Sequence, residues 1–96
     1  MIWMGKIKTV EIIVRGDIIE KNIILTFAEK LKTSRLRADF TSSIAVPPFL
    51  MAVEKSYPSI AVLYGTVDLE DLFQFKALVE ETCREESCSI VSFKEL

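Results

Sequence analysis

The sequence predicts a single small α+β domain, a two-layer sandwich built from one sheet and its helices. The chain has 96 residues, a length typical of one domain, and it contains no repeat and no linker-like segment. Short segments with alternating apolar residues take turns with longer segments whose apolar residues recur every three or four positions. Residues 1–96 are therefore expected to fold as one unit in the order β-α-β-(α)-β-α-β.

The first strand is predicted over residues 7–15, where Val10, Ile12 and Val14 share one face and the other face is polar from Thr9 onward except for Ile13. Gly16 ends this run. Asp17, followed three positions later by Glu20, is typical of the capping box at a helix N-terminus. The helix that follows is expected to end near Thr33 and is the most clearly amphipathic segment of the chain. Its apolar side chains recur at four-residue steps, at Ile19, Ile23, Phe27 and Leu31.

The second strand is predicted over residues 35–41, because apolar and charged side chains alternate there. A strand with one charged face is half exposed, so we expect it near an edge of the sheet. Pro47 and Pro48 suit the first turn of a helix. Apolar side chains then recur at helical spacing until Pro58, which predicts a middle helix.

The third strand is predicted over residues 59–65, a short and continuous apolar run that favours a buried central strand. Asp68 is a candidate N-cap for a last helix that reaches about Glu86. The last strand is expected over residues 89–93. In the last helix we expect one apolar stripe, which consists of Leu69, Leu72, Phe73, Val79 and Cys83, with Phe75 and Leu78 extending it.

Two architectures fit this order, and they differ in the role of the middle helix. If that helix is an excursion on a loop, the rest is the split β-α-β pattern of ferredoxin-like domains. If it is a crossover that packs on the sheet, the fold is a small three-layer α/β sandwich with a parallel sheet. The charged faces of the first two strands favour the ferredoxin-like arrangement, because a sheet covered on both sides has strands that are apolar on both faces.

Charge and composition exclude several classes of function. The net charge is −2, so no overall field draws the chain to nucleic acid or to an anionic membrane. Histidine is absent, which removes the usual general base and the commonest metal ligand. We therefore lean towards a protein that is not an enzyme and expect no cofactor and no metal. The start of the chain lacks a signal-peptide pattern, which favours the cytoplasm, and the scarcity of Asn and Gln is a thermophile-like bias.

The apolar content predicts association. Half of the residues are hydrophobic, which is high for a chain with so much surface for its volume. The candidate interface residues are Phe75, Leu78, Phe49 and Leu50; a middle helix that covers Phe75 and Leu78 is the alternative. We predict a non-catalytic protein-interaction or assembly module that forms a homo-oligomer or binds a different protein. A small-ligand-binding domain or minor enzyme and a nucleic-acid-binding domain are the alternatives.

Those alternatives have their own candidate residues. The turn at Gly65, Thr66 and Asp68 follows a predicted strand and precedes a helix, where α/β folds often bind phosphate, although Asp68 also suits a simple cap. A basic cluster could bind nucleic acid, or could form a solvated charged face. It consists of Lys30, Lys32, Arg35 and Arg37.

The two cysteines, Cys83 and Cys88, lie five positions apart where the last helix approaches the last strand. They are either two buried free thiols or a disulfide across a short turn. The sequence Cys-x-x-Cys of redox proteins is not present.

Residues 46–65 resemble lumazine synthases in one respect. Val46 and Pro47 stand before a predicted helix, and an apolar strand then ends at Gly65. The catalytic histidine of that family has no counterpart here, and Pro48 replaces the glycine that follows its Val-Pro pair. The resemblance implies a shared order of strand and helix and no shared catalysis.

Overall fold

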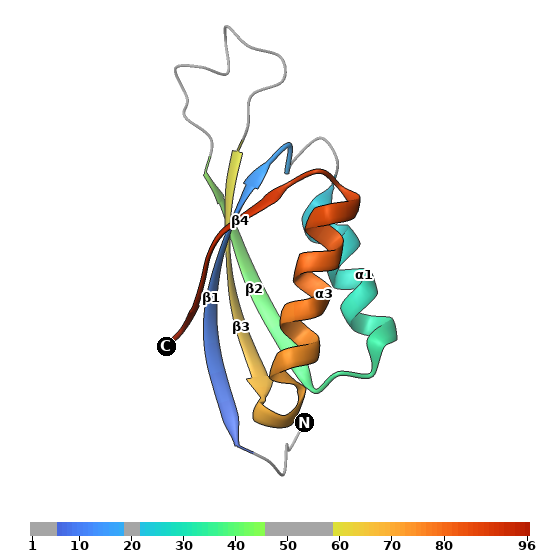
Figure 1. Cartoon of the computed structure of the whole chain (residues 1–96), viewed down its shortest axis with the longest axis vertical. Coiled ribbons are helices and arrows are strands. Elements are labelled where there is room, and N and C mark those ends of the chain that lie inside the picture. The colour runs from blue at the N-terminus through green and yellow to red at the C-terminus, as the bar shows by residue number, and fades with distance from the viewer. Residues whose placement is uncertain (1–5, 19–21, 46–58) are drawn as a thin grey trace, which may run out of the picture.

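The computed structural model describes residues 6–18, 22–45 and 59–96. These residues form four strands, two α-helices and one 3-10 turn (Figure 1). In chain order the elements are β1 (Ile7–Gly16), α1 (Ile23–Ser34), β2 (Ala38–Ala45), β3 (Ser59–Asp68), η1 (Leu69–Asp71), α3 (Leu72–Glu85) and β4 (Ser89–Glu95).

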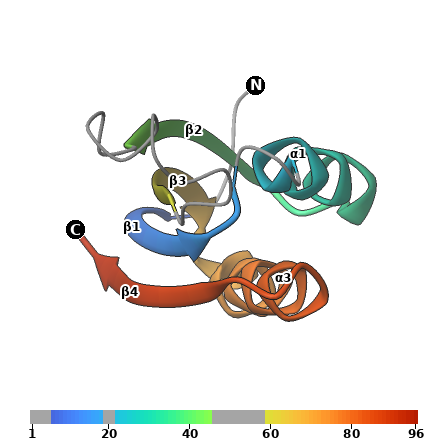
Figure 2. The same cartoon turned by 90° about the horizontal axis from the view of Figure 1, so that it is seen from above.

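All four strands form one antiparallel sheet in the order β2-β3-β1-β4. Both helices lie on the same face of this sheet, side by side, as the two views show (Figures 1 and 2). Each helix connects two strands that are separated in the sheet by one other strand. The result is a two-layer α+β sandwich with one face of the sheet covered and the other open.

The expected order of seven elements is wrong, and so is the alternative with a parallel sheet. The described residues contain two α-helices, and every strand pair is antiparallel. Because β2 and β3 are antiparallel neighbours, the sheet requires no crossover helix between them. The middle helix expected over residues 47–57 lies outside the described residues. The fold class is therefore corrected to an α+β sandwich of four antiparallel strands and two helices.

The first helix begins later than the capping box predicts. Asn22, in the left-handed conformation with φ 51°, precedes Ile23, the first residue of α1. Asp17 is therefore not the N-cap, and Glu20 lies outside the described residues. Ile18 is buried instead, and its backbone N–H donates to the hydroxyl of Ser59 at 3.3 Å. The chain thus enters the core before it turns into the helix.

The core lies between the sheet and the two helices. Phe27 of α1 and Phe75 of α3 are buried, with ring centroids 5.7 Å apart in an edge-to-face arrangement, and Phe40 of β2 packs 4.7 Å from Phe27. The sheet contributes alternate residues, which are Val10, Ile12 and Val14 of β1 and Ala61, Leu63 and Val67 of β3. The inward face predicted for the first strand is confirmed.

Gly65 lies within β3 and not in a turn. A Cβ atom there would meet the ring of Phe75 at 2.9 Å and the side chain of Val10 at 3.1 Å. The missing side chain lets the Phe75 ring approach the strand closely. Gly65 is therefore required by helix-to-sheet packing, and its assignment to a ligand-binding turn is corrected.

Candidate functional site

The face of the sheet that points away from α1 and α3, which we call the open face, carries the other set of alternating residues. On β1 these are Ile7, Thr9, Glu11, Ile13 and Arg15. The register with β3 places Ile13 opposite Val62, Arg15 opposite Ile60, and Glu11 opposite Tyr64. No helix among the described residues lies over this face (Figure 2).

Four side chains make the centre of the open face apolar. Ile60 and Tyr64 are 42% and 43% exposed, and Ile13 and Val62 are half-buried between their neighbours. We call these four residues the open-face patch. Isolated apolar side chains are normal on a protein surface, but here they are contiguous across the two central strands.

Mostly polar side chains flank the open-face patch on the two outer strands; the exception is Val91 of β4, which is 60% exposed at the bulge opposite Ile13 and Val14. The register places Asp39, Thr41 and Ser43 of β2, and Ser92 and Lys94 of β4, on the same face. On β1 the patch is flanked by Glu11 and Arg15, and the hydroxyl of Tyr64 is hydrogen-bonded to Glu11, which raises the pKa of Tyr64. An apolar centre within a polar rim is the usual composition of a protein–protein interface.

Sequence reasoning predicted β3 as a buried central strand, and only half of that prediction is confirmed. β3 is central in the sheet, and Ala61 and Leu63 are buried under the helices. The alternate residues Ile60, Val62 and Tyr64 face outward. The available signal was Ile13, which interrupts the otherwise polar outer face of the first strand.

Of the four predicted interface residues, the structure describes Phe75 and Leu78, and these two do not form a surface. Phe75 is fully buried in the core, so it is not available to a partner, and Leu78 is partly buried and packs against the same core. Phe49 and Leu50 lie outside the described residues. In contrast, Phe73, which the predicted stripe placed on the inner side of the last helix, is 82% exposed.

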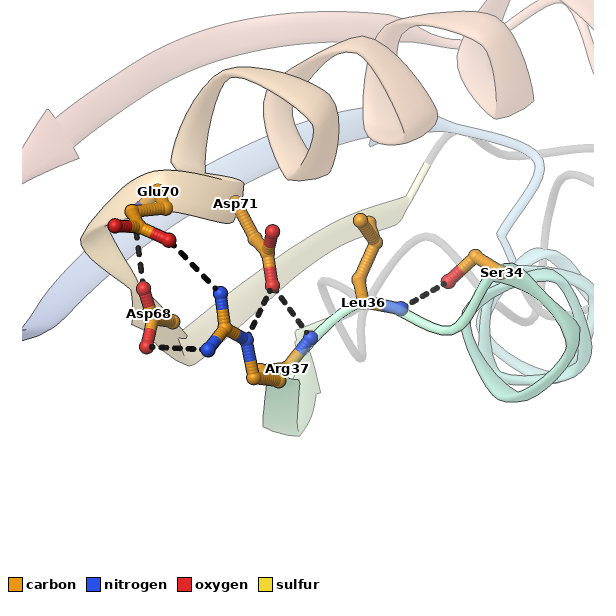
Figure 3. A network of polar contacts seen from close by, with 6 residues as sticks. All are labelled: Ser34, Leu36, Arg37, Asp68, Glu70 and Asp71. Atoms are coloured by element: carbon orange, nitrogen blue, oxygen red, sulfur yellow. Dashed lines mark hydrogen bonds and ion pairs between the residues drawn. The ribbon is translucent and has the colours of Figure 1, made fainter. Parts of the chain in front are cut away.

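Asp68, predicted as the N-cap of the last helix, caps the 3-10 turn η1 instead, since the N-cap of α3 is Asp71; Asp68 belongs to a polar network (Figure 3). Its side chain is fully buried; Oδ1 accepts from the backbone N–H of Glu70 at 2.9 Å, and Oδ2 lies 3.6 Å from Arg37. Asp71 accepts from both the backbone N–H and Nε of Arg37, at 2.9 and 3.2 Å. This network ties the start of β2 to the start of α3, with the exposed Thr66 two residues before the cap.

The predicted basic cluster is divided by ion pairs. Arg37 also contacts Glu70 at 3.2 Å, and the hydrogen bonds to Asp71 and Glu70 raise the pKa of Arg37. Lys30 pairs with Glu85 and, at 3.9 Å, with Glu81, so it links α1 to α3. Lys32 and the left-handed residue Arg35 lie exposed at the end of α1. Half of the cluster's positive charge is thus neutralised within the domain.

Cys83 and Cys88 are free thiols at the junction of α3 and β4. Cys83 is buried, and burial with the hydrogen bond to Cys88 raises its pKa to about 12. Cys88 is half-buried against Gly16, where a Cβ atom would lie 2.6 Å from that of Cys88. A thiol with so high a pKa is protonated near neutral pH, so Cys83 is not a nucleophile.

The described residues contain neither a cluster of metal ligands nor a helix that could span a membrane. Within residues 6–18, 22–45 and 59–96, His, Cys, Asp and Glu side chains form no group of three that could hold a metal ion. Neither helix in the described part of the chain is long and apolar enough to cross a bilayer.

Comparison with known proteins shows the fold and not a function. No protein-family model and no curated protein sequence matches the chain, so the resemblance to lumazine synthases has no support from a family match. A de novo designed protein, Foldit4, is similar in structure, with a TM-score of 0.64 over 95% of this chain and 97% of that chain, at 13% identity. A DUF3240 family protein from Shewanella baltica has a TM-score of 0.48 at 6% identity, over 93% of this chain and 87% of that chain.

Proposed function

We propose that this domain is a non-catalytic protein-interaction module that assembles with itself through the open face of its sheet. The observation that carries this proposal is the open-face patch. Ile13, Ile60, Val62 and Tyr64 are contiguous on the two central strands, opposite the face that the helices cover. Covering such a patch removes apolar surface from water, which is the main driving force of protein association.

The distribution of residues between central and outer strands supports the proposal. An antiparallel sheet with one solvated face normally alternates apolar and polar residues on every strand. β2 keeps that rule, with Asp39, Thr41 and Ser43 outward. The two central strands break it chiefly at Ile13 and Val62 and their neighbours; Ile7, at the start of β1, is a separate exposed apolar residue on this face. A local break in a regular pattern favours a specific function at that place.

We further propose a cytoplasmic location. Cys83 and Cys88 are free thiols in positions where their side chains interact. A reducing compartment keeps such a pair in this state. This part of the proposal predicts that both thiols react with a thiol reagent when protein purified without an oxidant is unfolded in denaturant, since Cys83 is buried in the folded chain.

The test compares two substitutions that each replace an outward-facing apolar side chain with lysine. We expect the wild-type chain to have a mass in native mass spectrometry that is a multiple of 10.9 kDa. Val62→Lys places a charge in the centre of the patch and should give a monomer. Phe73→Lys changes an apolar residue on the outer side of α3, remote from the open face, and should leave the mass unchanged.

Circular dichroism of both variants serves as the control for folding. A wild-type chain that remains monomeric over a wide concentration range would contradict self-assembly. A monomer caused by Phe73→Lys, with Val62→Lys still assembled, would place the interface on the helices instead.

A further inference from the structure

We infer that the open face binds a second copy of this chain, packed face to face about a two-fold axis that lies between the sheets, crosses β1 at right angles and passes over Ile13. This inference rests on the proposed self-assembly and specifies its geometry. It is carried by the way charged and apolar residues are placed about the pair Ile13 and Val62.

The charges on β1 are arranged symmetrically and with opposite sign. Glu11 and Arg15 share the open face with Ile13, each two positions away along the strand, or about 7 Å. Rotation about the proposed axis turns β1 end for end over the partner's β1. Arg15 then lies over the partner's Glu11, and the same pair forms again on the other side of the axis. The β1 strands of the two copies therefore form two ion pairs with each other.

The apolar residues of β3 obey the same rotation. Val62 pairs with Ile13, Ile60 with Arg15, and Tyr64 with Glu11. The rotation therefore places Val62 over the partner's Val62 and Ile60 over the partner's Tyr64. A branched aliphatic side chain packed against an aromatic ring fills the space between the sheets better than two large rings would. The apolar centre is thus covered by the same rotation that pairs the charges.

The other face-to-face arrangement about β1 is unfavourable. A two-fold axis parallel to β1 would place Glu11 over the partner's Glu11 and Arg15 over the partner's Arg15. Like charges opposed across an interface are strongly destabilising. Under either axis Lys94, which pairs with Glu11 in the sheet, lies away from the partner's Lys94, so the charges of β1 decide between the two arrangements. Packed sheets cross at about 30°, which displaces residues about 7 Å from Ile13 by roughly 3.6 Å, a shift that the long arginine side chain can span.

The area of the open face suits a dimer that dissociates on dilution. The two central strands have ten residues each in a four-stranded sheet. With a spacing of about 4.8 Å between strands, such a face covers roughly 600 Å² per copy, so two copies bury about 1,200 Å². Specific interfaces begin at about this size. We therefore expect a concentration-dependent equilibrium between monomer and dimer.

Charge reversal tests the axis directly. Glu11→Arg and Arg15→Glu each replace both ion pairs with like charges, so each variant alone should dimerise roughly tenfold more weakly or worse. When the two variants are mixed, every pair is again of opposite charge, and the heterodimer should be the dominant dimer. The three dimers differ in mass, so native mass spectrometry counts them separately.

Matched controls carry the same change of charge away from the open face. Glu29→Arg and Lys32→Glu both alter exposed residues of α1. Each should dimerise like the wild type, and a mixture of the two should give heterodimers only in the statistical proportion. The comparison therefore separates an effect of position from an effect of net charge.

The outcomes separate this inference from the proposed function. If Glu11→Arg and Arg15→Glu dimerise as well as the wild type and mix statistically, the axis is wrong while self-assembly stands. If the wild type is monomeric at every concentration, both fail. If Glu11→Arg does not fold, the salt dependence of the wild-type dissociation constant tests the axis instead. Two ion pairs require its dissociation constant to rise with salt, and a constant that is independent of salt overturns the inference.

Discussion

The two faces of β3 have nearly the same apolar character, yet they have different environments. Ala61, Leu63 and Val67 are at most 3% exposed beneath the helices, with the rings of Phe27 and Phe75 above the sheet. Ile60 and Tyr64, on alternate positions of the same strand, keep more than two fifths of their surface accessible. The comparison teaches that the apolarity of a strand does not distinguish the face that the helices cover from the face that they leave accessible.

The two faces also contribute to different free energies. Burial under α1 and α3 stabilises the folded chain, whatever its concentration. Burial of the open face, in our proposal, stabilises a dimer and therefore depends on concentration. Substitutions on the inner face should change the free energy of unfolding, and those on the open face should change the dissociation constant.

The largest effect is expected when the inner face loses its central ring. Phe75→Ala should lower the free energy of unfolding by about 3–5 kcal/mol, because the substitution leaves a cavity over Gly65. The measurement is urea denaturation followed by circular dichroism. Phe73→Ala, two positions away on the same helix, is the control, and its effect should stay within about 0.5 kcal/mol. Equal effects at the two positions would contradict the orientation of α3.

An intermediate effect is expected from the opposite change, the addition of volume to the inner face. Gly65→Ala places a Cβ atom 2.9 Å from the Phe75 ring and 3.1 Å from Val10, and this overpacking should cost about 1–3 kcal/mol. Thr66→Ala, on the outward side of β3, is the control and should change stability little. In the Phe75→Leu background the cost of Gly65→Ala should shrink. Additive effects of the two substitutions would show that they do not share this contact.

The sequence was sufficient to predict elements whose apolar periodicity is set locally. The alternation of Val10, Ile12 and Val14 predicted the inner face of β1, and Asp68 was predicted as a cap, which it forms at η1 and not at α3. The start of α1 could not be predicted, because Ile18 is drawn into the core and Asn22 takes a left-handed conformation before the helix begins. The first feature depends on a residue distant in the sequence, because the backbone N–H of Ile18 donates to the hydroxyl of Ser59.

The candidate site was missed for two physical reasons. A continuous apolar strand gives no sign of which residues the helices cover, so Ile60 and Tyr64 were not recognised as a surface. The apolar stripe of the last helix was counted from Leu69, but Leu69–Asp71 is a 3-10 turn with fewer residues per turn than an α-helix. The count was therefore out of phase, and it placed Phe73 inward when Phe75 is the buried ring.

The smallest effect concerns how firmly the helix layer is held over the inner face. Arg37 donates from its backbone and its side chain to Asp71, and these bonds lower the pKa of Asp71 below its ordinary value of 3.8. A lowered folded-state pKa contributes stability that is fully present at pH 7. It is lost as the pH falls from the ordinary value through the lower folded value.

Asp71→Asn removes the titrating carboxyl group. It tests how much the hydrogen bonds between Arg37 and Asp71 contribute to the stability of the fold. The variant should be less stable than the wild type at pH 7. The gap should begin to narrow as the pH falls below 3.8 and should close below the lowered folded-state pKa, where the folded wild-type carboxylate is protonated as well. Urea denaturation at a series of pH values measures the gap. A gap that stays constant across this range would mean that Asp71 acts through geometry alone, and that the helices are held over the inner face by apolar contacts.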